Sequence, residues 1–563
     1  MNDPRMGAKA QRKLHKPGTF VFTRPFMGIT HFISLPLILL FFFAFLLPYL
    51  AALGKAFNSG APGGISVWQN PSLLRITLFT LKQAFLSVLL SLAIGLPGAW
   101  FIGSPRSNPV LRTITAIPFA MPSILVVLSF VLFFGNSGWL NRFLSVIPGI
   151  GPLRILYKPQ AIILAHAFLN FPIVIRLAGD GFERARKVYA PAAAGLGASP
   201  FISAITVILP LSLPAIMSSA LLVFLYSFTS FAIVLVLGGG PSATTLAVEI
   251  YRHAKIFFNY QNAGALALVE TLIALSIFIT IVYFGKKSSK VKIDTEERII
   301  DEKKNPLSKI IVIVYLAAAA IFILGPLLSI IVESFLEQTS RSAAQVLSIR
   351  WWRGLGNTCL PSLLRSLILA FFSASLACAL SILAAASVKL IEGSGRENTP
   401  WVNFIRFFAA APIVSSGIVL GLGWLIIYGG NLPPITLALL HGLIALPFAF
   451  YSISEGFRSL PANTLNAAAV SGASPLMSII SAALPLSLKR IRSAWGFSAA
   501  LSMGELNAIM MLGSEKWETL PLYIFRAVGS YRYGTACAAG TLLLLCCSLF
   551  LLLSESGRKK YGS

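Results

Sequence analysis

The most informative shortage in this 563-residue chain is charge. Only 11% of its residues are charged and 56% are hydrophobic, whereas soluble globular proteins carry about 25% charged residues. This balance excludes a water-soluble globular protein, and the abundance of large apolar side chains excludes intrinsic disorder. With a mean hydropathy of +0.80, the chain is expected to be an all-α, polytopic membrane protein.

Cysteine is also scarce, and its placement excludes the sites that cysteines usually build. The five cysteines form no C-x-x-C pair, and most of them lie inside apolar runs. A disulfide framework or a zinc centre is therefore not expected. No metal site is predicted.

Catalytic and nucleotide-binding motifs are missing as well. The sequence contains no G-x-x-x-x-G-K-[S/T] loop, no H-E-x-x-H pair, no nucleophile elbow and no EF-hand pattern. We therefore predict no catalytic residue and no cofactor bound by this chain. Energy for any transport has to come from a partner protein or from an ion gradient.

The charge that is present is strongly basic, with 45 Lys and Arg against 19 Asp and Glu, a net charge of +26. In a soluble protein this excess would suggest nucleic acid. In a membrane protein it indicates orientation, because basic residues gather in cytoplasmic loops. The expected inside segments include the arm 1–30, the linker 285–309 and the tail 554–563, so both termini are predicted to be cytoplasmic and no nucleic-acid partner is expected.

Long apolar runs predict about twelve membrane-spanning helices, since a bilayer core needs about 20 apolar residues per helix. The charged linker 285–309 divides them into a first repeat at 31–284 and a second at 310–553. The expected spans are 31–53, 79–101, 111–134, 160–177, 210–237 and 263–284, then 310–332, 363–387, 404–428, 435–453, 491–512 and 534–553.

An internal repeat is the strongest pattern in the sequence. With the chain shifted by 275 residues, 14 of the 22 positions from Ala192 to Leu213 are identical to those from Ala467 to Leu488. Six spans separate the two copies, so they have the same orientation. Parallel repeats of this kind are related by an axis along the membrane normal, which predicts a pseudo-dimer around a pathway between the halves.

Each repeated segment is predicted to be a short helix-turn-helix on the cytoplasmic face. An Ala-rich run ends at a helix-stopping glycine, and a Ser-Pro pair then caps and starts the next helix. Two copies facing the same side favour a docking surface for two partner subunits over a loop that packs only on its own bundle. The candidate docking residues are Ala192, Ala193, Gly197, Ala198, Ser199, Pro200 and Pro210, with Ala467, Ala468, Gly472, Ala473, Ser474, Pro475 and Pro485 in the second copy.

These segments resemble the EAA loops of ABC-transporter permeases that are served by solute-binding proteins. The resemblance implies that each loop inserts into a cytosolic ATPase subunit, which binds ATP and Mg, and that an extracytoplasmic binding protein delivers the substrate. It also implies a place in the bacterial inner membrane. One departure is that the family's leading Glu is replaced by Pro191 and Asn466, which puts the usual ion pair with the ATPase in doubt.

The resemblance covers nearly the whole chain, which is similar to the fused two-half permeases for iron(III) and thiamine. Stretches such as Phe228-Thr229-Ser230-Phe231 and Thr519-Leu520-Pro521-Leu522-Tyr523 look closer to the thiamine permeases. Import of thiamine or its phosphate esters is therefore expected. The alternatives are iron(III) import and, from another class, an ion-coupled secondary transporter built from parallel repeats.

Ionisable residues inside the membrane are costly and are candidates for the substrate pathway. Glu505 is the most informative, because its repeat partner is Ser230 and the carboxylate exists in one half only. It could attract a cationic substrate, or it could bond to a neighbouring helix or pair with Lys82 or Arg365. For Glu270 nothing marks the helix face, and a structural role is expected.

The remaining candidates are more open to a structural interpretation. Lys82 and Arg365 lie near outer helix ends, where snorkelling explains them. His166 and His441 are equivalent by the repeat. On facing halves they could form a site, and structural hydrogen bonding is the expected role. Trp424 and Tyr428 are placed near the outer mouth, where they could stack on a flat cation.

Overall fold

The computed structural model confirms an all-helical membrane fold. Its one sheet in the described part of the chain is the antiparallel hairpin of β1 (Leu336–Gln338) and β2 (Gln345–Leu347). The predicted arm 1–30 lies outside the described residues, as does most of the linker 285–309. The structure describes residues 35–57, 68, 71–102, 121–148, 152–240, 243–289, 306–338, 345–393, 399–429, 433–460, 463–513 and 517–556.

The helices of the first half often begin at proline, whose fixed φ suits the first helical turn. Proline is also kept inside the long helix α8, at Pro172 and Pro191. The elements are η1 (Phe42–Leu46), α3 (Leu47–Gly54), η2 (Lys55–Phe57), α4 (Pro71–Ile102), α6 (Ser123–Phe134), α7 (Trp139–Leu144), α8 (Pro159–Gly195), α9 (Pro200–Ser203), η4 (Ala204–Ile208), α10 (Leu209–Phe228), α11 (Ala232–Leu237), α12 (Leu246–Lys255) and α13 (Tyr260–Ser289).

The second half repeats this order, and its described residues include the β hairpin after its first helix. Its helical elements are α14 (Pro306–Glu333), α15 (Arg350–Arg353), α16 (Cys359–Gly393), α17 (Pro400–Ala410), η6 (Ala411–Ile413), α18 (Gly417–Tyr428), α19 (Pro434–Arg458), α20 (Asn463–Val470), α21 (Pro475–Ser478), η7 (Ile479–Ala483), α22 (Leu484–Leu486), α23 (Leu488–Gly504), α24 (Asn507–Leu512), α25 (Leu520–Gly529) and α26 (Tyr533–Ser556).

The expected count of twelve unbroken spans is not confirmed. Among the described residues ten helices are long and apolar enough to cross a membrane, or eleven if α17 and α18 are taken as one span bent by 97°. The predicted span 404–428 is thus broken, because Pro412 interrupts the hydrogen-bond ladder and Ser416 caps a new helix. The predicted span 491–512 is also broken, at Glu505–Leu506, which leaves α23 with 17 residues.

The repeat is preserved in the structure at the level of single elements. The π-helical segment at 204–208 recurs at 479–483, in both cases directly after the Ser-Pro-capped helix. The break after α10 recurs after α23, and each break is followed by a six-residue helix. The 275-residue period therefore describes backbone geometry as well as sequence.

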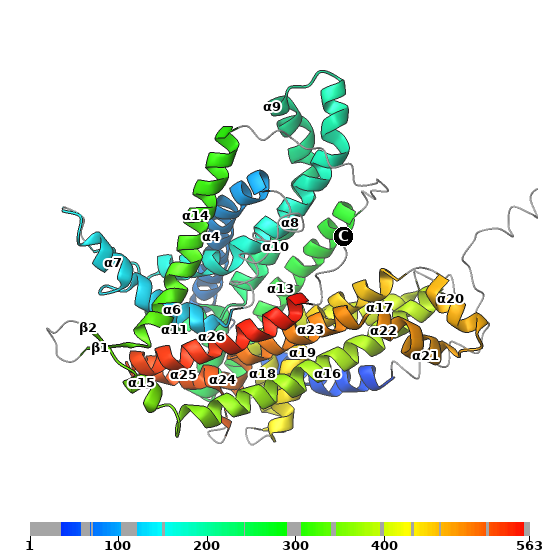
Figure 1. Cartoon of the computed structure of the whole chain (residues 1–563). Coiled ribbons are helices and arrows are strands. Elements are labelled where there is room, and N and C mark those ends of the chain that lie inside the picture. The colour runs from blue at the N-terminus through cyan, green and yellow to red at the C-terminus, as the bar shows by residue number, and fades with distance from the viewer. Residues whose placement is uncertain are drawn as a thin grey trace, which may run out of the picture.

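The two halves exchange their first helices. Helix α3 of the first half packs on α18 of the second, and α14 of the second half packs on α6 of the first. In Figure 1 helix α9 lies at the top and α20 and α21 at the far right, whereas α7, α15 and the β hairpin gather at the left. The two repeated loops thus lie at separate ends of the molecule, away from the hairpin.

Candidate functional site

The first repeated loop joins α8 to α9 by a tight turn. Gly197 follows the helix with a φ of +84°, a left-handed conformation that glycine adopts at little cost. The Ala198 amide donates to the Ala193 carbonyl at 3.0 Å, and the Gly197 amide donates to the Ala194 carbonyl at 2.9 Å. This pair of bonds is the Schellman C-cap. The turn predicted at this glycine is present.

The turn ends where a serine starts the next helix. Ser199 Oγ accepts from the Ile202 amide at 3.3 Å, and Pro200 is the first residue of α9. The bond satisfies one of the amides that a helix N-terminus leaves without an intrahelical partner.

The second loop has the same geometry. Gly472 has a φ of +86°, and the Ala473 amide donates to the Ala468 carbonyl at 3.0 Å. Ser474 Oγ accepts from the Met477 amide at 3.3 Å, and Pro475 starts α21. Two copies of one local motif therefore form two equivalent projections. The side chain of Asn466 lies outside what the structure describes.

Most of the candidate docking residues lie on the surface. Pro191 and Ala192 in the last turns of α8 are exposed, as is Pro210 in α10. Of the candidates, Ala193 and Pro475 are buried and hold the turns against their own bundles. The exposed candidates are Ala192, Gly197, Ser199, Pro200, Pro210, Ala467, Gly472, Ser474 and Pro485, and the half-buried ones are Ala198, Ala468 and Ala473.

Large apolar side chains surround each projection. Phe201 is 73% exposed, and its counterpart Leu476 is 47% exposed. Three pairs of exposed side chains are equivalent by the repeat, namely Phe201 with Leu476, Ile202 with Met477, and Ile205 with Ile480. We call these six residues the loop faces. Exposed apolar patches of this kind mark contacts with a partner protein or with the membrane.

In each half a glycine allows two helices to pack closely: α8 with α10, and α19 with α23. A Cβ on Gly181 of α8 would lie 2.7 Å from the Ala215 Cβ of α10, and one on Gly456 of α19 would lie 3.0 Å from the Arg490 Cβ of α23. Close packing of this kind makes α8 with α10, and α19 with α23, stiff helix pairs. In the second half the separate helix α20 lies between α19 and the loop. Gly181 and Gly456 are equivalent at the 275-residue offset.

The candidate pathway residues Glu505 and Ser230 occupy the equivalent breaks in the two halves. Glu505 Oε1 accepts from the amides of Asn507 at 2.9 Å and Ala508 at 3.2 Å. The carboxylate therefore caps α24, whereas α11, which follows Ser230, has no side-chain cap. Ion pairs in the described part of the chain involve neither Glu505 nor the candidate partners Lys82 and Arg365.

Trp424 and Tyr428 lie on α18 against the first helix of the other half. Trp424 is buried, and its indole N–H donates to the Ala44 carbonyl at 2.7 Å. The Tyr428 hydroxyl, on a more exposed side chain, donates to the Phe43 carbonyl at 2.7 Å. Both carbonyls belong to the π-helical segment η1, where the wider turn changes the usual hydrogen bonding. The two aromatic residues thus tie the halves together.

The paired histidines are buried and bonded to serines. His166 Nδ1 lies 3.3 Å from Ser87 Oγ, and His441 Nδ1 lies 3.0 Å from Ser502 Oγ. Ser87 lies on α4, while Ser502 lies on α23, so equivalent histidines contact different helices. The expected hydrogen bonding is present.

The polar turn at the start of α18 was not among the predicted site residues. Ser416 and Gly417 start α18 at its sharp bend, between the buried Glu270 of α13 and Glu505. The signal was the Ser-Ser-Gly run at 415–417 inside an apolar stretch, which is a helix-capping composition.

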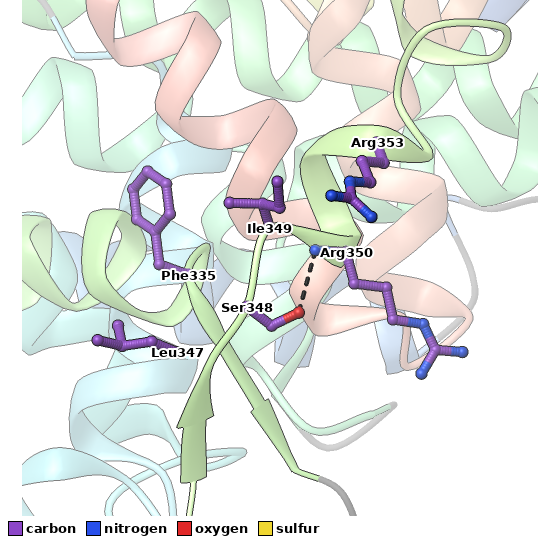
Figure 2. Close-up of a pocket in the computed structure, with 6 residues that line it drawn as sticks. All are labelled: Phe335, Leu347, Ser348, Ile349, Arg350 and Arg353. Carbon is purple, nitrogen blue, oxygen red and sulfur yellow. Dashed lines mark hydrogen bonds between the residues drawn. The ribbon is translucent and has the colours of Figure 1, made fainter.

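A basic surface pocket lies at the end of the molecule that carries the β hairpin, away from the repeated loops. Figure 2 shows Arg350 and Arg353 on α15 beside Leu347 and Ser348, with the Arg350 amide donating to Ser348 Oγ at 3.1 Å. Arg350 also pairs with Glu337 of β1. Hydrogen bonds from Arg350 and Ser348 hold the pKa of the Glu337 carboxyl below its usual value.

Comparison with known proteins identifies the family of this chain. Residues 88–285 match the family model described as the binding-protein-dependent transport system inner membrane component. The thiamine transport system permease proteins of Escherichia coli (strain K12) and Haemophilus influenzae are each 27% identical to this chain, over 90% of it and 93% of their own length. The spermidine/putrescine transport system permease protein of Escherichia coli is 30% identical over 40% of this chain and 83% of its own length.

A solved bacterial ABC transporter that imports the polysaccharide alginate is 17% identical and covers 51% of this chain, with a TM-score of 0.37. That likeness is too weak to add to the assignment. The family model and the relatives match this chain by sequence, and its helical membrane architecture agrees with that match. The chain belongs to the family of inner membrane components of binding-protein-dependent transport systems.

Proposed function

We propose that this chain is the complete transmembrane permease of an ABC importer for thiamine or its phosphate esters. The observation that carries the proposal is the duplicated loop, with one capped turn and one loop face per half. Relatives that share both halves of the chain are thiamine permeases, which supports the substrate. The protein is then a pore subunit, with ATP hydrolysis on a separate partner.

Two copies of one ATPase subunit would bind the two loop faces. Because Phe201, Ile202 and Ile205 have equivalents at Leu476, Met477 and Ile480, two identical subunits meet nearly the same apolar surface. Neither loop has the leading Glu of the family, so docking depends on apolar burial and backbone shape. ATP and Mg belong to those subunits.

Coupling would run from each loop into its own half. Helix α8 is continuous from Pro159 to Gly195, so a push on the turn at Gly197 moves the whole helix. Gly181 and Gly456 keep the next helix in close contact. When the ATPase subunits close, the two halves would rotate as rigid bodies and expose the pathway to the outer side in turn.

The orientation follows from the same loops. The ATPase side is cytoplasmic, so α9 and α21 face the cytoplasm, and both chain termini lie on that side. The β hairpin and α15 face outward, where a solute-binding protein would dock near Arg350 and Arg353.

The test is reconstitution of the permease with its ATPase and binding protein in proteoliposomes, followed by uptake of labelled thiamine. We expect uptake that requires ATP and the binding protein together. Uptake that persists without the ATPase, driven by an ion gradient, would contradict the importer. Ferric iron run in parallel checks the substrate: import of iron without thiamine would contradict the thiamine assignment alone.

A further inference from the structure

A buried carboxylate lies at the interface between the halves without a cation. Glu270 of α13 is 1% exposed, and neither of its carboxylate oxygens makes a hydrogen bond within the described part of the chain. No ion pair of the described residues includes it. Burial of an uncompensated carboxylate is costly, so its retention calls for a partner that is present only part of the time.

Ser416 of the second half is the polar side chain beside this carboxylate, although the two do not meet in hydrogen-bond geometry. The Oγ atom of Ser416 caps α18 by accepting from the Val419 amide at 3.2 Å. Helix α18 starts there after the 97° bend from α17. An interrupted helix in the membrane is the arrangement that transport proteins use to place polar groups within the bilayer.

A second carboxylate lies on the other side of the same turn. A Cβ on Gly417 would come within 3.2 Å of Glu505 Oε1 and 3.3 Å of the Asn507 Cβ, so the turn packs closely against both side chains. Asn507 Oδ1 is buried and has no hydrogen-bond partner among the described residues. Glu270, Ser416, Glu505 and Asn507 therefore surround one turn and present acceptors to it.

Each of these two acids also occurs in only one half of the chain. At the 275-residue offset the counterpart of Glu270 is Leu545 of α26, and the counterpart of Glu505 is Ser230, so neither acid is repeated. An asymmetric pair of acids in a symmetric scaffold suits one small asymmetric ligand.

We propose that Glu270, Ser416, Glu505 and Asn507 form a subsite in the permease that holds the positive charge of an organic cation as it crosses between the halves. Glu270 supplies the main charge, Glu505 adds to it through the oxygen that does not cap α24, and Asn507 Oδ1 accepts a hydrogen bond from the ligand. The inference rests on the proposed import function. For thiamine the group held is the permanently charged thiazolium ring.

The experiment compares uptake of labelled thiamine by the reconstituted complex with Glu270→Gln, Glu270→Asp and the control Glu518→Gln. Glu518 is a carboxylate that already pairs with Arg526 at 2.8 Å, away from the turn. We expect Glu270→Gln to lower the uptake rate about tenfold or more, Glu270→Asp to keep most of it, and Glu518→Gln to leave it unchanged. Gel filtration of each complex checks assembly.

Three results separate the possible failures. Uptake by Glu270→Gln within twofold of the unaltered protein overturns the subsite while thiamine import stands. Equal loss in the Gln and Asp variants also overturns it, because shape and not charge would then be responsible. If the unaltered complex imports no thiamine, the same variants are measured with putrescine: Glu270-dependent putrescine uptake supports the cation subsite and removes the thiamine assignment, and no import of either cation overturns both.

Discussion

The two halves of this permease agree in their scaffold and differ in their charges. In both, a hydroxyl on the second helix accepts the first amide of a short helix: Thr80 from Leu246 at 3.1 Å, and Ser366 from Leu520 at 2.8 Å. The loop turns repeat to within 2° in the φ of Gly197 and Gly472. The buried acids do not repeat.

The difference separates two kinds of demand on the molecule. Features that would meet a symmetric pair of partners are duplicated, because in the proposed importer each half couples to one ATPase subunit. Features that would meet one substrate occur once, because the pathway lies between the halves. Duplication within the chain is thus a guide to which residues couple and which recognise the substrate.

The largest expected effect comes from charging the loop faces. Phe201→Glu or Leu476→Glu places a carboxylate in an apolar contact, and loss of a central apolar anchor costs about 2 kcal/mol or more at an interface. We expect binding of the purified ATPase to fall at least about tenfold for each single variant and to vanish in the double one. The measurement is co-purification and titration with the ATPase subunit.

The comparison supplies the control. Phe201→Leu converts the first-half residue into its second-half counterpart and is expected to bind the ATPase almost as well as the unaltered chain. Strong loss in only one of the two Glu variants would show that the halves do not couple equally.

A smaller effect is expected at the glycine turns. Gly197→Val forces a branched residue into a left-handed backbone, at a cost of about 1–2 kcal/mol, and should lower the melting temperature and uncouple the loop. The matched control is Gly195→Val, two residues earlier on the helix, where the second half already has Val470. Thermal unfolding of both variants decides the matter: an equal loss would mean that general crowding, and not the φ angle, is responsible.

The broken helices should show a difference between the halves. Glu505→Ala removes a cap that accepts two amides and is expected to cost about 1 kcal/mol. Ser230→Ala at the equivalent break should change stability by less than about 0.5 kcal/mol, since α11 has no side-chain cap. Melting curves of the two purified variants test this, and equal losses would contradict the asymmetry.

How far the sequence predicts this structure depends on whether the signal is local. The turns at Gly197 and Gly472 and their Ser-Pro caps are set by neighbouring residues, so the sequence predicts them in detail. The bonds from Trp424 and Tyr428 to the carbonyls of Ala44 and Phe43 join residues about 380 positions apart, and no periodicity specifies such a pairing.

The breaks in the predicted spans differ in how local their sequence signal is. Helix α18 starts at a Ser-Ser-Gly run that could have been identified as a cap, whereas the break at Glu505–Leu506 has no proline, and its one glycine is Gly504. At that break Gly504 packs closely on the other half, since a Cβ on it would lie 2.8 Å from Pro122. The environment of Glu270 likewise depends on the opposite half and could not be predicted from its own helix.

The smallest expected effect is a pH response confined to the second half, which alone carries the hairpin among the described residues. Because its pairing with Arg350 and Ser348 lowers the folded-state pKa of Glu337, the stabilisation is present above the usual glutamate pKa of about 4.3 and is lost as the pH falls through the lower folded value. Hydrogen exchange at β1 and β2 should therefore accelerate in acid. Arg350→Gln should remove most of this pH dependence; an unchanged profile would mean that the pair does not hold the hairpin.

The exchanged first helices have a consequence for biogenesis. Helix α3 is made near the start of translation, but its main packing partner α18 is made about 370 residues later. Until then the first helix has its contacts with α13 of its own half but not those with α18. Contacts so distant in sequence form slowly and leave surfaces exposed in the meantime. A ribosome stalled in the second half would therefore leave a membrane-inserted chain whose first helix is a target for quality-control proteolysis.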